Sequence, residues 1–167
     1  MIDHDLRKAA TGVLALCRAR GLKISTAESC TGGLVAAALT EIAGSSDVVD
    51  CGFVTYSNEA KQSLVGVPAT TLKQHGAVSE QTAAAMAAGA LKNSRADLSV
   101  AITGIAGPGG GSKKKPVGLV YFAAASRSGR LLACSRRYGK IGRRRVRLHS
   151  VVEALELLRL LAEQISP

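Results

Sequence analysis

Large aromatic side chains are almost missing from this chain. Tryptophan is absent, and tyrosine and phenylalanine together make up 3% of the 167 residues. An interior without large rings has to be built from valine, leucine, isoleucine and alanine, which suits a sheet packed between helices. With 47% hydrophobic and 20% charged residues, the composition is typical of a compact soluble protein. We expect residues 1–167 to form a single domain with an ordinary core.

Long apolar runs are missing as well. No stretch approaches the roughly 18 apolar residues of a membrane span, and the N-terminal sequence MIDHDLRKAATG lacks the apolar region of a secretory signal. We therefore expect a cytoplasmic protein that makes no membrane contact. The 4 cysteines form no CxxC pair, and 3 histidines are too few for a zinc site. Free, mostly buried thiols are expected at Cys17, Cys30, Cys51 and Cys134.

Acidic residues are in short supply: 12 face 22 lysines and arginines, which gives a formal net charge of +10. The positive charge is concentrated in residues 136–147 (RRYGKIGRRRVR) and in the lysine run 113–115. Such a cluster indicates an anion site, either for nucleic acid or for a phosphorylated small molecule. A solvated face is the commoner meaning of a single charge run.

Hydrophobic periodicity and turn residues predict alternating helices and strands. The expected helices are 3–20, 32–43, 57–66, 80–93 and 143–164, and the expected strands are 22–26, 48–56, 97–104, 117–125 and 130–138. A loop region around Pro68 follows the third helix. The early alternation favours parallel pairing, whereas a hairpin of the last two strands adds an antiparallel one. The predicted fold class is α/β, a three-layer α/β/α sandwich with a five-stranded mixed sheet.

Three polar segments follow strands of this predicted sheet: ESCTGG (28–33), YSNEAK (56–61) and TGIAGPGGGSKKK (103–115). Ligands gather beyond the carboxyl ends of parallel strands, so the segments should converge on one site. The strand-to-helix turn exposes Ser29, and the amides of residues 30–33 point to the same space, where they could hold an oxyanion. Helix capping by Ser29 or Thr31 is the commoner use of such residues, and the segment lacks the G-x-S-x-G pattern.

A serine hydroxyl needs a base before it becomes a good nucleophile. The histidines do not lie in an obviously active setting, whereas Lys61 falls in the first turn of its predicted helix. The positive end of the helix dipole and burial in the cleft would lower its pKa, so that a neutral amine takes the serine proton. A surface position is the commoner fate of a lysine. The glycine-rich segment 103–118 can cradle a phosphate with its amides, or it is simply a flexible loop.

Six motifs in this order, AESCTGG, VTYSNEAK, LVGV, GAVSEQTA, AITGIAGPGGG and KPVGLVYFA, closely resemble the C-terminal domain of the competence/damage-inducible protein CinA, the nicotinamide mononucleotide deamidase family. The resemblance runs from about residue 5 to 160. It implies an amidohydrolase that converts nicotinamide mononucleotide and water to nicotinic acid mononucleotide and ammonia. It also implies an α/β/α sandwich and neither a metal nor an organic cofactor.

The resemblance carries over to individual residues. The family's Ser-Lys dyad matches Ser29 and Lys61, and its motif tyrosine matches Tyr56, which we expect to form a hydrogen bond within the dyad. Arg143 is expected to neutralise the substrate phosphate together with the glycine-rich loop. The expected substrate-binding residues are Thr31, Gly32, Gly33, Thr103, Gly104, Gly107 and Arg143.

The chain departs from the family pattern at two points. Gly142 stands where the family usually has an aspartate, while Arg143 and Arg147 match its arginines. Family proteins of the CinA type also carry an additional N-terminal domain, so the chain resembles the stand-alone form. We expect a homodimer or a higher homo-oligomer, with a small-molecule nucleotide as substrate.

Three other interpretations stay open. Cys30 could be the nucleophile in place of Ser29, since it would sit at the same helix start. Residues 136–147 could bind nucleic acid, although they lack the interleaved aromatics that stack on bases. The chain could also be a catalytically silent domain that binds a protein partner, against which the complete set of Ser29, Tyr56 and Lys61 argues.

Overall fold

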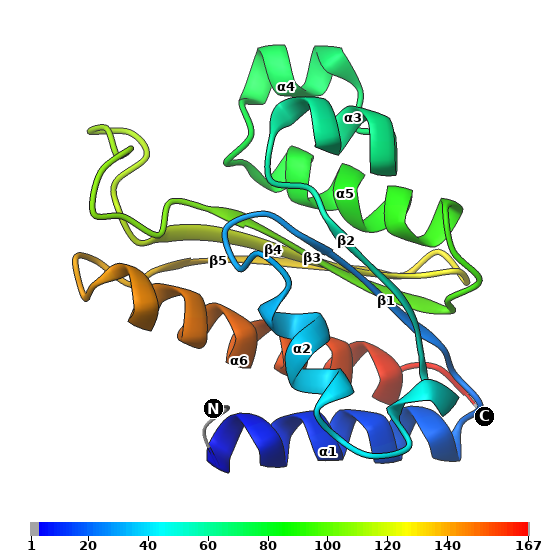
Figure 1. The fold of residues 1–167 in the computed structure, drawn as a ribbon. Coiled ribbons are helices and arrows are strands. Elements are labelled where there is room, and N and C mark those ends of the chain that lie inside the picture. Colours follow the sequence, from blue (N-terminus) through cyan, green and yellow to red (C-terminus); the bar gives the residue numbers. More distant parts are fainter. Residues whose placement is uncertain (1–3, 167) are drawn as a thin grey trace.

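A five-stranded mixed sheet forms the centre of the protein (Figure 1). The structure is a computed structural model that describes residues 4–166. The strands are β1 (Ile24–Glu28), β2 (Val49–Val54), β3 (Leu98–Gly104), β4 (Leu119–Ser126) and β5 (Leu131–Arg137), in the spatial order β2-β1-β3-β4-β5. β1 pairs in parallel with β2 and β3, whereas β4 is antiparallel to both β3 and β5. The predicted α/β class with a five-stranded mixed sheet is confirmed.

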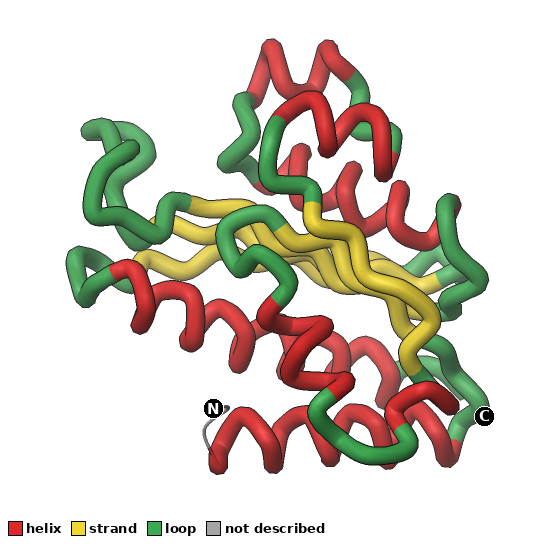
Figure 2. Tube along the Cα trace, viewed as in Figure 1, coloured by secondary structure: helices red, strands yellow, loops and turns green. Residues whose placement is uncertain are grey.

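Helices cover both faces of the sheet (Figure 2). One face carries α1 (His4–Ala19), α2 (Leu34–Thr40) and α6 (Arg143–Glu163), and the other carries α3 (Asn58–Val65), α4 (Ala69–His75) and α5 (Glu80–Lys92). A short 3₁₀ helix (Ser45–Asp47) precedes β2. In the part of the chain that the structure describes, no helix is both long enough and apolar enough to cross a bilayer.

Two apolar layers hold the helices to the sheet. β3 lies in the middle and is buried on both faces from Leu98 to Thr103, as the near-continuous apolar run in its sequence predicts. Small and branched side chains fill both layers, and Phe122 is the large ring among the fully buried side chains of the described residues. The scarcity of aromatic residues therefore corresponds to a core of aliphatic side chains.

Helix α4 was not predicted, because the sequence indicated a loop region there. The structure has a helix over Ala69–His75 that follows Pro68 directly. None of its residues is buried, so it carries no apolar stripe that periodicity could detect. The predicted start of the first helix at residue 3 lies outside the described residues.

The register of the parallel strands brings three turns to one edge of the sheet. Glu28 at the end of β1 lies beside Val54 at the end of β2 and beside Ile102 near the end of β3. The residues that follow these strands, 29–33, 55–61 and 105–110, therefore meet at the carboxyl edge of the sheet, where parallel sheets bind their ligands.

Candidate active site

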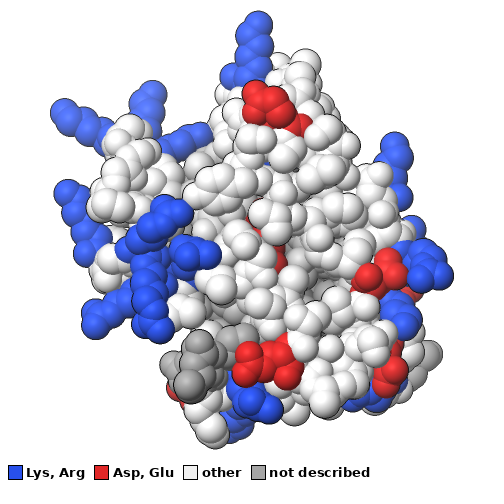
Figure 3. All heavy atoms as spheres, in the orientation of Figure 1, with Lys and Arg blue, Asp and Glu red and all other residues white. Residues whose placement is uncertain are grey.

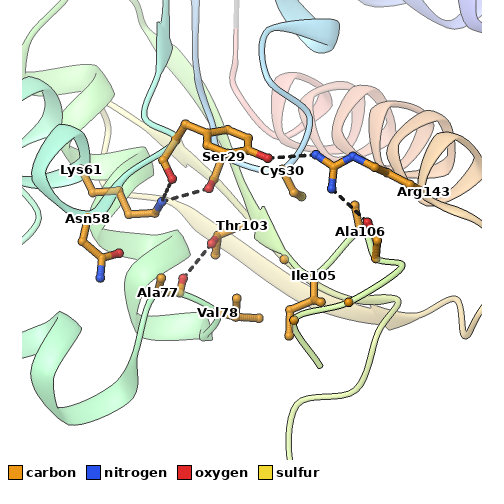
Figure 4. Close-up of a pocket in the computed structure, with 15 residues that line it drawn as sticks. Ser29, Cys30, Asn58, Lys61, Ala77, Val78, Thr103, Ile105, Ala106 and Arg143 are labelled. Atoms are coloured by element: carbon orange, nitrogen blue, oxygen red, sulfur yellow. Dashed lines mark hydrogen bonds between the residues drawn. The ribbon is translucent and has the colours of Figure 1, made fainter. Parts of the chain in front are cut away.

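A cavity of about 290 Å³ lies at this carboxyl edge (Figure 4). Its lining comes from all three turns, from the segment that precedes α5 and from the start of α6. The lining residues that carry polar side chains are Ser29, Cys30, Tyr56, Asn58, Lys61, Thr103 and Arg143. The structure thus brings together most of the side chains that the sequence predicted for one site.

A buried contact between two polar side chains of the cavity joins Ser29 and Lys61. Lys61 Nζ lies 2.9 Å from Ser29 Oγ, and the two residues are 32 positions apart in the sequence. Ser29 is held from the sheet, since its amide donates to the Ile102 carbonyl at 2.9 Å. Lys61 reaches it from α3, with 1% of the residue exposed to solvent.

Burial lowers the pKa of the Lys61 amine below its usual value, because desolvation disfavours the charged form; interaction with Cys30 opposes this more weakly. Of the two predicted causes, burial in the cleft is confirmed, and the effect of the helix start stays a prediction. Nζ also donates to the carbonyls of Thr55 at 2.8 Å and Tyr56 at 3.4 Å. A neutral amine has two N–H groups and one lone pair, so these carbonyls can accept both N–H groups and leave the lone pair for the Ser29 hydroxyl.

Glu28, the residue before Ser29, is a fully buried carboxylate. Its oxygens accept hydrogen bonds from the amides of Gly33 at 3.1 Å, Val35 at 3.0 Å and Ala36 at 2.9 Å. The Thr26 hydroxyl lies 3.3 Å from the same carboxylate. The side chain that accepts hydrogen bonds from the amides at the start of α2 is therefore Glu28. The alternative interpretation, in which Ser29 or Thr31 caps this helix, does not hold, since the helix has Gly33 as its N-cap residue and no side-chain cap there.

The structure places part of the predicted substrate site in the cavity and part of it outside. The Gly33 amide is engaged by Glu28, and the Gly32 amide donates to the Ser29 carbonyl at 3.0 Å. Thr31 is fully buried. These three residues lie outside the cavity lining, whereas the other expected residues line it, namely Thr103, Gly104, Gly107 and Arg143.

Tyr56 contacts the Ser29–Lys61 pair differently from the prediction. Its phenol oxygen accepts a hydrogen bond from Arg143 Nη2 at 2.9 Å, and 58% of the residue is exposed. The contact with Lys61 comes from the Tyr56 main-chain carbonyl. Arg143 Nη1 donates in addition to the Gly107 carbonyl at 3.0 Å, so Arg143 links the turn after β2 to the loop after β3 (Figure 4).

Arg147 follows Arg143 by one helical turn in α6. It contacts the loop segment that carries Ser29 from outside the cavity. Its Nε donates to the Cys30 carbonyl at 3.1 Å, and its Nη2 donates to the Thr31 carbonyl at 2.9 Å. The sequence predicted no contact for Arg147, and it predicted no role in the site for Glu28, Asn58, Ala77 or Val78. The last two belong to the GAVSEQTA motif, which was recognised without a place in the site.

Cys30 is a buried thiol beside Ser29. Desolvation raises the pKa of this thiol to about 11, so it stays protonated at neutral pH and is a weak nucleophile. Within residues 4–166, no group of three His, Cys, Asp or Glu side chains is close enough to hold a metal ion.

Lysines and arginines gather at the end of the molecule where the β3–β4 loop and the start of α6 lie (Figure 3). The side chains of residues 136–147 differ in their contacts: Arg136 forms an ion pair with Glu153, whereas Arg144 and Arg145 are exposed. Within the described residues no carboxylate pairs with Arg143. The cavity mouth therefore carries positive charge that attracts an anionic ligand.

Comparisons with known proteins agree with one another. The model of the CinA C-terminal domain family matches residues 6–162. The nicotinamide-nucleotide amidohydrolase PncC of Escherichia coli is 56% identical over 129 residues, which are 77% of this chain and 78% of PncC. A competence-damage inducible protein of Caldicellulosiruptor bescii is 58% identical over 126 residues, which are 75% of this chain and 30% of that longer protein.

A solved structure has the same fold. The competence/damage inducible protein CihA from Agrobacterium tumefaciens superposes with a TM-score of 0.95 at 55% identity, and the match covers 98% of this chain and 99% of that one.

Proposed function

Because the chain belongs to the CinA C-terminal domain family, we propose that it is an amidohydrolase that converts nicotinamide mononucleotide to nicotinic acid mononucleotide and ammonia. The E. coli relative named as a nicotinamide-nucleotide amidohydrolase supports this substrate. The observation that carries the proposal is the buried contact of 2.9 Å between Lys61 Nζ and Ser29 Oγ. The alternative, a catalytically silent basic domain, receives no support from the relatives.

Ser29 acts as the nucleophile and Lys61 as its base. Neutral Lys61 accepts the Ser29 proton while the serine oxygen forms a bond to the carboxamide carbon. Lys61 then donates this proton to the amide nitrogen, the C–N bond breaks and ammonia leaves. Water attacks the acyl-enzyme in the same manner, with Lys61 taking a proton from water and returning it to Ser29 as the acid is released.

The substrate is held by the groups around this pair. The Gly33 amide is engaged by Glu28 and the Gly32 amide by the Ser29 carbonyl, and Thr31 lies outside the cavity lining. The candidate donors for the oxyanion are therefore the amides of Cys30 and of the loop that follows β3. Arg143 binds the phosphate, because its present partners are a phenol and a carbonyl and its charge is not compensated by a carboxylate. The homodimer expected from the resemblance stays a prediction.

Ammonia release from nicotinamide mononucleotide by the purified protein tests the proposal directly. Turnover of this substrate supports it. A protein that folds correctly and releases no ammonia from nicotinamide mononucleotide would falsify the proposed reaction.

The turnover number should rise with pH and reach a plateau. Below the pKa of Lys61 the amine is protonated and cannot accept the serine proton, and above this pKa it can. Because burial lowers the pKa of Lys61, the midpoint of this increase should lie below pH 10.5, which is the ordinary pKa of a lysine. Initial rates at saturating substrate and constant ionic strength measure it. A turnover number that falls between about pH 6 and 9 contradicts a neutral-lysine base.

Replacing Cys30 with alanine should leave the turnover number within about threefold of the original, because the thiol is protonated at neutral pH and is not the nucleophile. Steady-state rates of ammonia release measure the effect, and alkylation of the unmodified protein with iodoacetamide provides a second readout. Inactivation of the Cys30→Ala variant to the level of the Ser29→Ala variant would instead identify Cys30 as the attacking group.

A further inference from the structure

Two charged residues outside the cavity lining hold the turn that carries Ser29. Glu28 contacts the chain after the turn through three amides, and Arg147 contacts the turn itself through two carbonyls. We infer that Glu28 and Arg147 are positioning residues, which together keep the Ser29 hydroxyl within hydrogen-bonding distance of the Lys61 amine. This inference rests on the proposed function of Ser29 and Lys61.

Glu28, the first of these two positioning residues, is a buried anion without an ionic partner. In residues 4–166 no salt bridge is formed by Glu28, and a buried charge without compensation is strongly unfavourable. The amides of Gly33, Val35 and Ala36 provide the compensation, helped by the positive end of the α2 dipole. The start of α2 is therefore tied to the residue next to the nucleophile.

Arg147, the second positioning residue, connects the turn to a different layer of the fold. Arg147 belongs to α6, which packs on β3 and β4, and its guanidinium bridges the carbonyls of Cys30 and Thr31 with a planar pair of donors. A flexible or shorter side chain at this position could not contact both carbonyls in one geometry. The turn is thus fixed relative to the sheet by Glu28 and relative to α6 by Arg147.

Glu28 also connects the turn to the base. Its main-chain carbonyl accepts a hydrogen bond from the Thr55 amide at 2.8 Å, and the Thr55 carbonyl in turn accepts one from Lys61 Nζ at 2.8 Å. The separation of Ser29 Oγ and Lys61 Nζ therefore depends on the same few contacts. A displacement of about 1 Å at a reacting group can cost on the order of 10²-fold in rate.

The first test uses Arg147→Ala, with two readouts. The rate at which a fluorophosphonate probe labels Ser29 reports the reactivity of the hydroxyl without any nicotinamide substrate, and ammonia release reports turnover. We expect both to fall by about 10²-fold, with KM for nicotinamide mononucleotide changed by less than about threefold. Methylguanidinium added to the buffer should restore part of both rates, because it can occupy the vacated site.

A matched control is Arg127→Ala. Arg127 also donates to main-chain carbonyls, those of Leu91 at 2.8 Å, Ala96 at 3.0 Å and Ser94 at 3.1 Å, but these carbonyls lie in the segment before β3, at the opposite edge of the sheet. It should lose thermal stability to a similar degree while keeping the labelling rate and the turnover number.

The Glu28→Gln variant tests the positioning role of Glu28. Glutamine has nearly the same shape as glutamate. Its side-chain NH₂ group is a donor, however, and would face main-chain N–H groups that now donate hydrogen bonds to the carboxylate. We expect the Ser29 labelling rate and the turnover number to fall by about tenfold or more at unchanged KM. If both Arg147→Ala and Glu28→Gln label at the original rate, the inference is overturned. It is also overturned if the losses follow the fall in unfolding temperature and methylguanidinium restores nothing.

The two readouts separate this inference from the proposed function. A wild-type protein that releases no ammonia from nicotinamide mononucleotide counts against the substrate alone. Slower probe labelling of Ser29 in the two variants would still support the positioning role under that outcome.

Discussion

Replacing Ser29 with alanine is expected to lower the turnover number for nicotinamide mononucleotide by about three orders of magnitude or more. Without Oγ no acyl-enzyme can form, and the contact of 2.9 Å to Lys61 is lost. Replacing Lys61 with methionine should be similarly severe, because methionine fills much of the same buried space but has no amine to accept the proton. Since the two residues act as a unit, the double variant should be little worse than either single one.

Steady-state ammonia release measures these losses, and thermal unfolding shows whether the variants still fold. Ser63→Ala and Lys73→Ala are matched controls, because both residues are exposed on the neighbouring helices α3 and α4, and both variants should keep full activity. A Lys61→Met variant with substantial turnover would show that another group accepts the serine proton.

Replacing Arg143 with alanine is expected to raise KM for nicotinamide mononucleotide by about 10- to 10²-fold, since a charge-assisted hydrogen bond contributes about 1.5–3 kcal/mol. The rate with free nicotinamide, which has no phosphate, should change little. The comparison of the two substrates isolates the phosphate contact, because any damage to the dyad would lower both rates. An equal loss with both substrates would remove Arg143 from the phosphate site.

Arg144→Ala is the matched control for this experiment. It removes the same charge from the next position of α6, from an exposed side chain outside the cavity lining. If the positive field alone attracts the substrate, the two variants should have similar KM values. If Arg143 binds the phosphate directly, only Arg143→Ala should show the large increase.

Much of the fold could be predicted because apolar patterns mark the elements that are buried. The run of apolar residues in β3 and the stripe along α6 correspond to buried side chains. Helix α4 was missed because none of its residues is buried. The start of α2 at Leu34 in place of residue 32 reflects positive φ angles of 60° at Gly32 and 98° at Gly33, which a right-handed helix cannot include.

The site was less predictable than the fold, because its contacts join residues that are distant in the sequence. Position after a strand places Ser29 and Lys61 at one edge of the sheet, and the resemblance to a family selects them among other polar residues. No local pattern indicates that the Tyr56 phenol accepts from Arg143, 87 positions away. No local pattern shows either that the Glu28 carboxylate accepts hydrogen bonds from the amides at the start of α2, since a carboxylate before a turn can equally face a ligand.

The pairing of β1 with β2 has a consequence for the newly made chain. Ser29 and Lys61 follow these two strands, which pair in parallel, and parallel neighbours form late because a crossover must close first. On the proposed mechanism, the serine has no base beside it until that crossover closes, and before then it is as unreactive as any other hydroxyl. Recovery of turnover after dilution from denaturant therefore cannot precede the joining of these two strands, whereas circular dichroism reports the helices.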